Sequence, residues 1–169
     1  MTRRLLSIGH SYVVDVNRRL PQELQAQSEG RWEVTVAAPD HFQGRNDLRR
    51  QVLSIDSDEP VEVRSIPARR TGRVHVFSYG RELRQLIREG GFDLIHAWEE
   101  PYIYAGWQIA RAAKGVAPVV YRSAQSLPKK YPPPFSYFER TCVAQMAGWS
   151  KRISCNALGT RIVRVTARR

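Results

Sequence analysis

The side chains best suited to chemistry in this sequence stand beside short apolar runs. Histidine occurs at positions 10 and 96, and an imidazole titrates near neutral pH, so each ring can donate, accept or take up a proton. Glu99 offers a carboxylate that can accept hydrogen bonds from hydroxyl groups. A lone histidine at a strand end is as often structural. Because both histidines fall beside comparable apolar runs, we favour a functional role for both.

These side chains need a scaffold, and the hydrophobic pattern predicts one. Short runs rich in Leu, Ile and Val predict buried strands, and stretches of helical period separate them. The strands are expected at residues 5–8, 33–37, 61–66, 94–97 and 118–121. Helices are expected at residues 17–27, 79–89, 101–115 and 135–147. The predicted class is α/β: a doubly wound, mainly parallel sheet with helices on both faces.

Details of the helices follow from their residue types. Leu20 and Leu24 should form the buried row of the first helix. Pro101 suits the first position of the third helix, and Glu100 before it would be an acidic N-cap. In the last helix Cys142 recurs with apolar residues at helical spacing, which favours a small core side chain over a nucleophile.

In an open parallel sheet the ligand crevice lies beyond the carboxyl ends of the strands. The residues that follow the predicted strands are therefore the candidate site. They are Gly9, His10, Ser11 and Tyr12 after the first strand, His96 and Glu99 at the fourth, and Gln125 and Lys130 in the long polar loop after the fifth. No G-x-G-x-x-G and no G-K-[ST] occurs, which disfavours a dinucleotide fold and a P-loop enzyme. Asp56-Ser57-Asp58 is expected to be a solvated turn, and His41 and His75 receive no role.

Length and composition set further bounds. With 169 residues and 42% hydrophobic residues, the chain can bury one core but not two. Its two cysteines, Cys142 and Cys155, cannot build a disulfide framework and lack metal-ligand spacing. No apolar stretch approaches the length of a membrane span, so we expect a soluble, cytoplasmic chain.

The net charge of +11 is unevenly distributed. Residues 151–169 contain six Lys and Arg residues and no acid, so +6 of that charge lies there and +5 in residues 1–150. A basic surplus can indicate nucleic acid or an anionic membrane surface as partner. We expect no specific nucleic-acid partner, and peripheral membrane contact stays open. A non-enzymatic basic binding domain is the alternative, and its salt-dependent binding should vanish without residues 151–169.

Four segments resemble the N-terminal, acceptor-side domain of family 4 glycosyltransferases, which are retaining enzymes of the GT-B fold. Residues 93–108, DLIHAWEEPYIYAGWQ, are similar to the fourth-strand segment of that domain. Residues 9–20 resemble its first loop and helix, residues 34–39 its second strand, and residues 125–140 its fifth-strand loop and the following helix. The resemblance covers residues 4–149.

The resemblance implies transfer of a sugar from a nucleotide-sugar to an acceptor held by this lobe, with no metal or other cofactor. His96 matches a position near the transferred sugar, and we expect it to be catalytic. Acceptor or substrate binding is expected of Gly9, His10, Ser11, Tyr12, Glu99, Gln125 and Lys130. Where the family pattern continues with Asn after Gln125, this chain has Ser126.

The likeness ends before the second lobe, which would bind the nucleotide-sugar and stabilise its leaving phosphate. Residues 150–169 resemble neither the next strand nor a linker, and their Arg-rich, acid-free composition suggests a shifted reading frame or an early stop. We therefore expect a domain at 4–149, an aberrant basic tail at 150–169 outside the fold, and an isolated chain that is inactive. A flavodoxin-like signalling domain would want an acidic cluster at the first and third strand ends, which the sequence does not supply.

Overall fold

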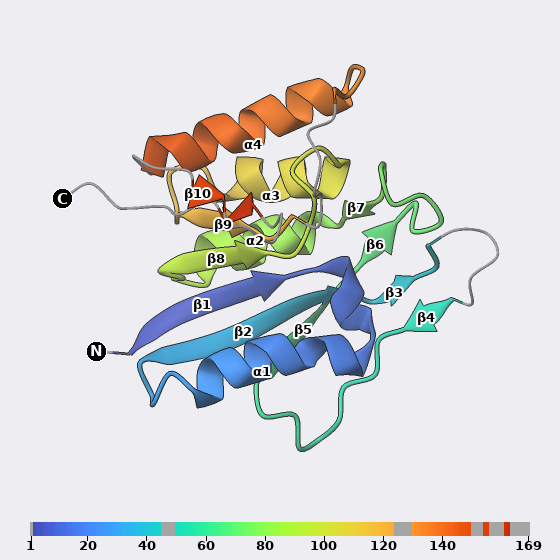
Figure 1. Ribbon diagram of the computed structural model, residues 1–169. Helices are drawn as coiled ribbons and strands as arrows, with labels where there is room; N and C mark the ends of the chain where they lie inside the picture. The colour runs from blue at the N-terminus through green and yellow to red at the C-terminus, as the bar shows by residue number, and fades with distance from the viewer. Residues whose placement is uncertain (1, 45–49, 124–129, 150–153, 156–160, 163–169) are drawn as a thin grey trace.

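A parallel sheet forms the centre of the computed structural model, which describes residues 2–44, 50–123, 130–149, 154–155 and 161–162. Its five strands are ordered β5-β2-β1-β8-β9 (Figure 1). They are β1 (Arg3–Ile8), β2 (Trp32–Pro39), β5 (Glu62–Ile66), β8 (Leu94–Ala97) and β9 (Val119–Tyr121). Every pairing in this sheet is parallel, and the chain order reverses between β1 and β8. The predicted α/β class is confirmed, and the reversal marks β1 and β8 as the place where a crevice opens.

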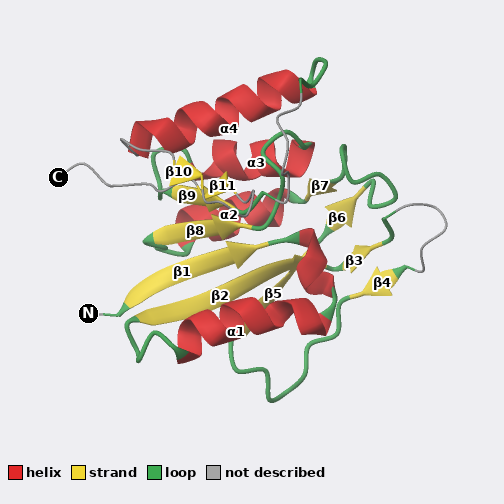
Figure 2. Ribbon diagram, in the orientation of Figure 1, coloured by secondary structure: helices red, strands yellow, loops and turns green. Residues whose placement is uncertain are grey.

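Helices cover both faces of the sheet, as expected. Figure 2 shows α1 on one side, α2 and α3 on the other, and α4 outside α3. The helices are α1 (Arg19–Ala26), α2 (Arg81–Glu89), α3 (Tyr104–Ala113) and α4 (Phe135–Trp149). Among the described residues, none of the helices combines the length and apolar character needed to cross a bilayer.

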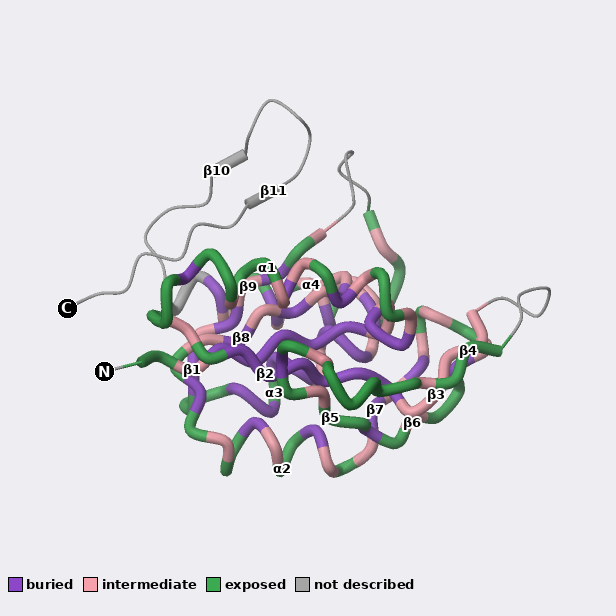
Figure 3. Tube along the Cα trace, turned by 90° about the horizontal axis from the view of Figure 1, so that it is seen from below, coloured by how far each residue is buried: buried purple, intermediate pink, exposed green. Residues whose placement is uncertain are grey.

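The pleat of the strands divides the core into two layers. Leu6 and Ile95 belong to the cluster beneath α2 and α3, whereas their neighbours Leu5 and Leu94 belong to the cluster on the α1 side. Successive side chains of a strand point to opposite faces, so His96 lies on the same face as Leu94. The central strands are buried along most of their length (Figure 3).

Short elements surround this frame. Two antiparallel pairs lie beyond the carboxyl ends of β2 and β5: β3 (His41–Phe42) with β4 (Gln51–Val52), and β6 (Ala68–Arg69) with β7 (Ser78–Tyr79). A separate pair joins β10 (Ser154–Cys155) to β11 (Arg161–Ile162). Two turns of 3-10 helix, η1 (His10–Val13) and η2 (Asp15–Arg18), connect β1 to α1. Two-residue strands are too short for a periodic signal, which is why the sequence did not predict them.

The start of the third helix was predicted wrongly. α3 begins at Tyr104, and Ile103 occupies the N-cap with an extended backbone and no side-chain cap, so Glu100 does not cap the helix. Residues 100–103 instead form a turn in which the Ile103 N–H donates to the Glu100 carbonyl at 3.2 Å. That carbonyl lies so close to Gly106 that a Cβ there would overlap it. The turn therefore folds back over the first helical turn, which shifts the helix start past Pro101.

The buried side of the first helix also differs from expectation. Leu24 is 41% exposed, and the side chains buried there are Pro21 and Arg18 just before the helix. The Arg18 guanidinium donates to both carboxylate oxygens of Glu59 at 3.1 Å and to the Tyr12 carbonyl at 3.0 Å. Arg18, and not Leu24, is therefore among the side chains buried here.

The apolar stripe predicted for the last helix is found on α4. Cys142 and Met146 are buried in the cluster that includes α3, and the buried Phe138 packs against the rings of Tyr104 and Trp107 in α3. Burial raises the pKa of the Cys142 thiol to about 12, a hydrogen bond with Tyr121 lowers it in part, and the Glu139 charge raises it. Cys142 is thus a protonated core side chain, as predicted.

Candidate functional site

The loops that follow β1 and β8 approach each other closely at the carboxyl edge of the sheet. The Trp98 N–H donates to the Ile8 carbonyl at 2.7 Å. A Cβ built on Gly9 would lie 3.1 Å from the Trp98 Cβ and 3.3 Å from the Trp98 carbonyl oxygen. Glycine at position 9 therefore permits the backbones to meet, which brings His10 and Glu99 within hydrogen-bonding distance.

Glu99 is the most constrained side chain of the site. It is only 1% exposed, yet its carboxylate accepts three hydrogen bonds from donors on two other segments. The His10 backbone N–H donates to Oε1 at 2.6 Å, the His10 ring Nδ1 lies 2.7 Å from Oε2, and the Tyr79 hydroxyl donates to Oε1 at 2.7 Å. Hydrogen bonds to a carboxylate are short and strong, so this side chain is held in one orientation.

Glu99 in turn fixes the imidazole of His10. With Nδ1 engaged by the carboxylate, Nε2 is the nitrogen that has no hydrogen-bond partner within the described part of the chain. The rings of Phe42 and Phe77 pack against His10, with centroids 4.6 and 5.6 Å away. The His10 side chain keeps 26% exposure. The geometry thus presents one oriented imidazole at the carboxyl edge of the sheet.

Opposing effects act on the pKa of His10. Burial of the ring lowers its pKa, but the charge of Glu99, the hydrogen bond to it and the charge of Glu100 together outweigh burial. The pKa of His10 is therefore raised above 6.5. When protonated, the ring can donate from Nε2 to an oxygen of a ligand. When neutral, with the proton on Nδ1, it can accept from a hydroxyl there.

His96 lies in a different environment. Its Nδ1 is 2.8 Å from the Ser7 hydroxyl, which is itself 2.7 Å from the Tyr12 hydroxyl. Burial, assisted by the positive charge of Arg122, lowers the pKa of His96 to about 4. Tyr12 is fully buried, and burial raises the pKa of its phenol to about 12. The catalytic role expected of His96 and the binding role expected of Tyr12 stay predictions.

The neutral state of His96 can be measured directly. We expect its ring to titrate near pH 4 in an NMR pH series, because burial penalises the imidazolium. As this pKa lies below the 6.5 of an unfolded histidine, the ring's contribution to stability should be present above pH 6.5 and be lost as the pH falls toward 4. A ring that titrated at its ordinary value would contradict this assignment.

The remaining predicted site residues do not take part in the hydrogen bonds of Glu99 that the structure describes. The Ser11 hydroxyl is buried and has no hydrogen-bond partner among the described residues. Lys130 is exposed, and within the described part of the chain no hydrogen bond or ion pair joins it to Glu99. Its neighbour Tyr131 stacks on Tyr102 at 4.1 Å. Gln125 lies outside the described residues.

Two side chains of the site received no role from the sequence. Tyr79, expected at the start of a helix, lies in β7 and binds Glu99. Arg122 follows the fifth strand directly, and its guanidinium carbon lies 3.8 Å from the centre of the Trp98 ring. Its place after a predicted strand put it among the positions to consider, but nothing in the sequence assigned it a role. The pairing of Tyr79 with a residue 20 positions away left no signal in the sequence.

Other polar groups at this edge are paired with one another. Ser123 donates to a Glu100 carboxylate oxygen at 2.6 Å, and the Nδ1 of His41 lies 2.9 Å from an Asp40 oxygen. Within the residues that the structure describes, no three His, Cys, Asp or Glu side chains are grouped so that they could hold a metal ion. The expectation that sugar transfer here needs no metal stays a prediction.

Comparison with known proteins bears on this arrangement. Curated proteins and solved structures gave no match. Among protein families, Glycosyltransferase Family 4 matches residues 16–161. This span begins after His10 and includes Glu99. Because the match covers most of the sequence and agrees with the parallel sheet, this chain belongs to Glycosyltransferase Family 4.

Proposed function

We propose that the chain is the acceptor-side domain of a retaining glycosyltransferase, which moves a sugar from a nucleotide-sugar to a glycan, lipid or small-molecule acceptor. Family membership supports the enzyme over a non-enzymatic basic binding domain. The observation that carries the proposal is the His10 ring, oriented by the buried Glu99 carboxylate at the carboxyl ends of β1 and β8. This is where a doubly wound sheet binds its ligand.

In the proposed reaction a hydroxyl oxygen of the acceptor bonds to the anomeric carbon of the donor sugar. The bond from that carbon to the phosphate oxygen breaks, and the phosphate leaves with the electron pair and takes up the hydroxyl proton. His10 holds an oxygen of the acceptor through Nε2, while Glu99 keeps the ring from rotating. The contribution of these residues is positioning, which reduces the entropy lost on the way to the transition state.

Stabilisation of the leaving phosphate needs cations or other donors close to it. In our proposal a second lobe supplies them and binds the nucleotide, as in enzymes of the GT-B fold. These residues alone then bind acceptor without turnover. Residues 4–149 are proposed to form the acceptor-binding unit, with residues 150–169 outside it.

Acceptor binding by the 169-residue chain tests this proposal. Saturation-transfer NMR with a panel of glycans and glycosides should identify a ligand whose affinity falls by about tenfold or more in His10→Ala, because a hydrogen bond to an oriented imidazole is lost. His41→Ala is the matched control: it removes a histidine at the same edge that pairs with Asp40, whereas the hydrogen bonds of Glu99 come from His10 and Tyr79. Equal binding by His10→Ala and the parent chain would contradict the role of His10.

Retention is tested separately. The chain joined to a donor-binding lobe should give a product whose anomeric proton shows the configuration of the donor sugar by NMR. A product of inverted configuration would contradict the retaining mechanism. Turnover by the 169-residue chain alone would contradict the need for a second lobe.

A further inference from the structure

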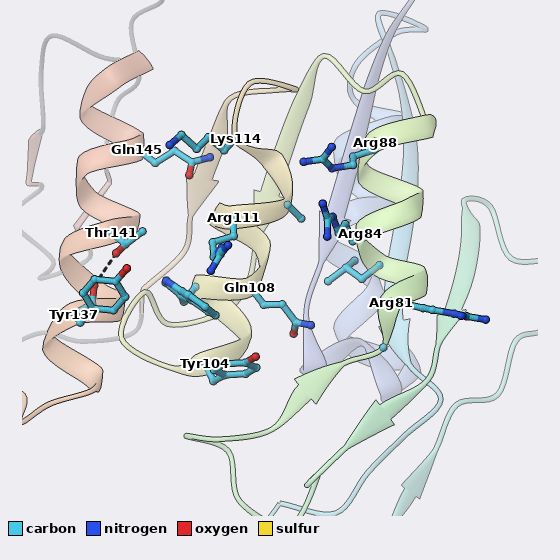
Figure 4. A pocket seen from close by; sticks show the side chains of 14 residues that line it. Arg81, Arg84, Arg88, Tyr104, Gln108, Arg111, Lys114, Tyr137, Thr141 and Gln145 are labelled. Atoms are coloured by element: carbon cyan, nitrogen blue, oxygen red, sulfur yellow. Dashed lines mark hydrogen bonds between the residues drawn. The ribbon is translucent and has the colours of Figure 1, made fainter.

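A second concave surface lies on the outer side of the helices, away from the His10–Glu99 pair. It is a groove of about 800 Å³ between α2, α3 and α4. Figure 4 shows side chains from all three helices around it. The groove shares no lining residue with the set of His10, Glu99 and Tyr79.

The charge of this groove is positive throughout. Its lining contains no Asp or Glu, whereas five cations contribute to it: Arg81, Arg84 and Arg88 of α2, Arg111 of α3, and Lys114 after it. In Figure 4 the side chains of Arg84 and Arg88 extend from α2 toward α3, and that of Arg81 points away. Two helices thus direct guanidinium groups toward a shared space.

One pair of like charges on α2 faces the groove. Arg84 and Arg88 are four residues apart on one helix face, where like charges repel. Arg81 lies 3.8 Å from Glu82, and Arg88 lies in the last turn of α2, where the helix dipole favours a cation, so the repulsion left unbalanced is that between Arg84 and Arg88. Arg84 and Arg88 form no ion pair with any acid of the described residues. An anion in the groove would relieve this repulsion.

The uncharged lining adds hydrogen-bond donors. The indole Nε1 of Trp107 and the side-chain nitrogen of Gln145 are buried and have no partner among the described residues. Arg111 lies over the Trp107 ring, 4.9 Å from its centre, which orients the guanidinium in the groove. Guanidinium groups present paired N–H donors that match the oxygens of a phosphate.

We infer that this groove binds a ligand through its phosphate groups, at a site separate from sugar transfer. The ligand is either a soluble phosphate ester or the headgroup of an anionic phospholipid, since both present the same oxygens. Arg84, Arg88 and Arg111 are the main contacts, and Trp107 reports on occupancy.

The test follows the indole N–H signal of Trp107, assigned with Trp107→Phe, while inorganic pyrophosphate is added to the full chain. We expect a saturable shift whose apparent affinity falls by about tenfold or more in a triple variant, R84Q/R88Q/R111Q, since three charge-assisted contacts are lost. R19Q/R50Q/R140Q is the matched control, because it removes the same charge from exposed positions outside the groove. Circular dichroism verifies that both variants are folded.

Vesicle sedimentation then identifies the source of the phosphate. Phosphatidylcholine vesicles with and without phosphatidylglycerol are compared. Binding to the anionic vesicles that is lost in the groove variant, but kept in the control, assigns the site to lipid headgroups. A pyrophosphate response with the same pattern, and no vesicle binding, assigns it to a soluble ligand. If the groove variant and the control behave alike with both probes, the inference is overturned.

Discussion

Glu99→Ala should lower the free energy of unfolding by about 3–5 kcal/mol, the cost typical of removing one partner from a buried ion pair. The carboxylate is 1% exposed and satisfies the His10 backbone N–H, the His10 ring and the Tyr79 hydroxyl together. Alanine removes the acceptor of all three. Donors left buried without a partner carry their full desolvation penalty.

Urea denaturation followed by tryptophan fluorescence measures this loss. Glu89→Ala serves as the control, because Glu89 is an exposed residue at the end of α2 whose carboxylate accepts from Gln85 at the surface. It should change stability by less than about 0.5 kcal/mol. A Glu99→Ala variant as stable as this control would show that the three hydrogen bonds do not hold the loops after β1 and β8 together.

The sheet was predictable from the sequence because its strands form short runs rich in Leu, Ile and Val, and β1 and β2 are buried along most of their length. Each of the five predicted strands is present, and the strand at 94–97 has the predicted limits. Helix ends were harder to place. The turn at 100–103 is local, but the position of Pro101 favoured an earlier helix start than the structure has. The buried Arg18–Glu59 pair joins distant segments, so local preference misplaced the exposed side of Leu24.

For the candidate site, the sequence predicted which positions lie near one another but not which side chains pair. Positions after the strands, such as Gly9, His10 and Glu99, do meet at the carboxyl edge of the sheet. What the sequence could not assign was the partner of each histidine. His10 and Glu99 are 89 residues apart, as are His96 and Ser7, and either histidine could have paired with the carboxylate. The alternation of β8 decides between them: it places His96 beside Ser7, whereas Glu99 follows the strand and meets His10.

This difference predicts that Glu99→Gln reverses the pKa shift of His10. In the parent chain the ring should titrate above 6.5, because Glu99 and Glu100 together outweigh the burial that is the largest single influence. The amide of glutamine has a similar size and no charge, so only the smaller effect of Glu100 then opposes burial. The His10 ring of Glu99→Gln should therefore titrate below 6.5.

An NMR pH series of both proteins measures the shift, and His96 is the internal control, since burial and Arg122 set its pKa of about 4 without Glu99. The raised pKa of His10 also makes stability depend on pH: its contribution is complete below 6.5 and is lost as the pH rises through the folded-state pKa. The stability difference between the parent chain and Glu99→Gln should thus shrink with rising pH in that window. A His10 pKa that stayed above 6.5 in Glu99→Gln would show that another group, and not this carboxylate, holds the charge on the ring.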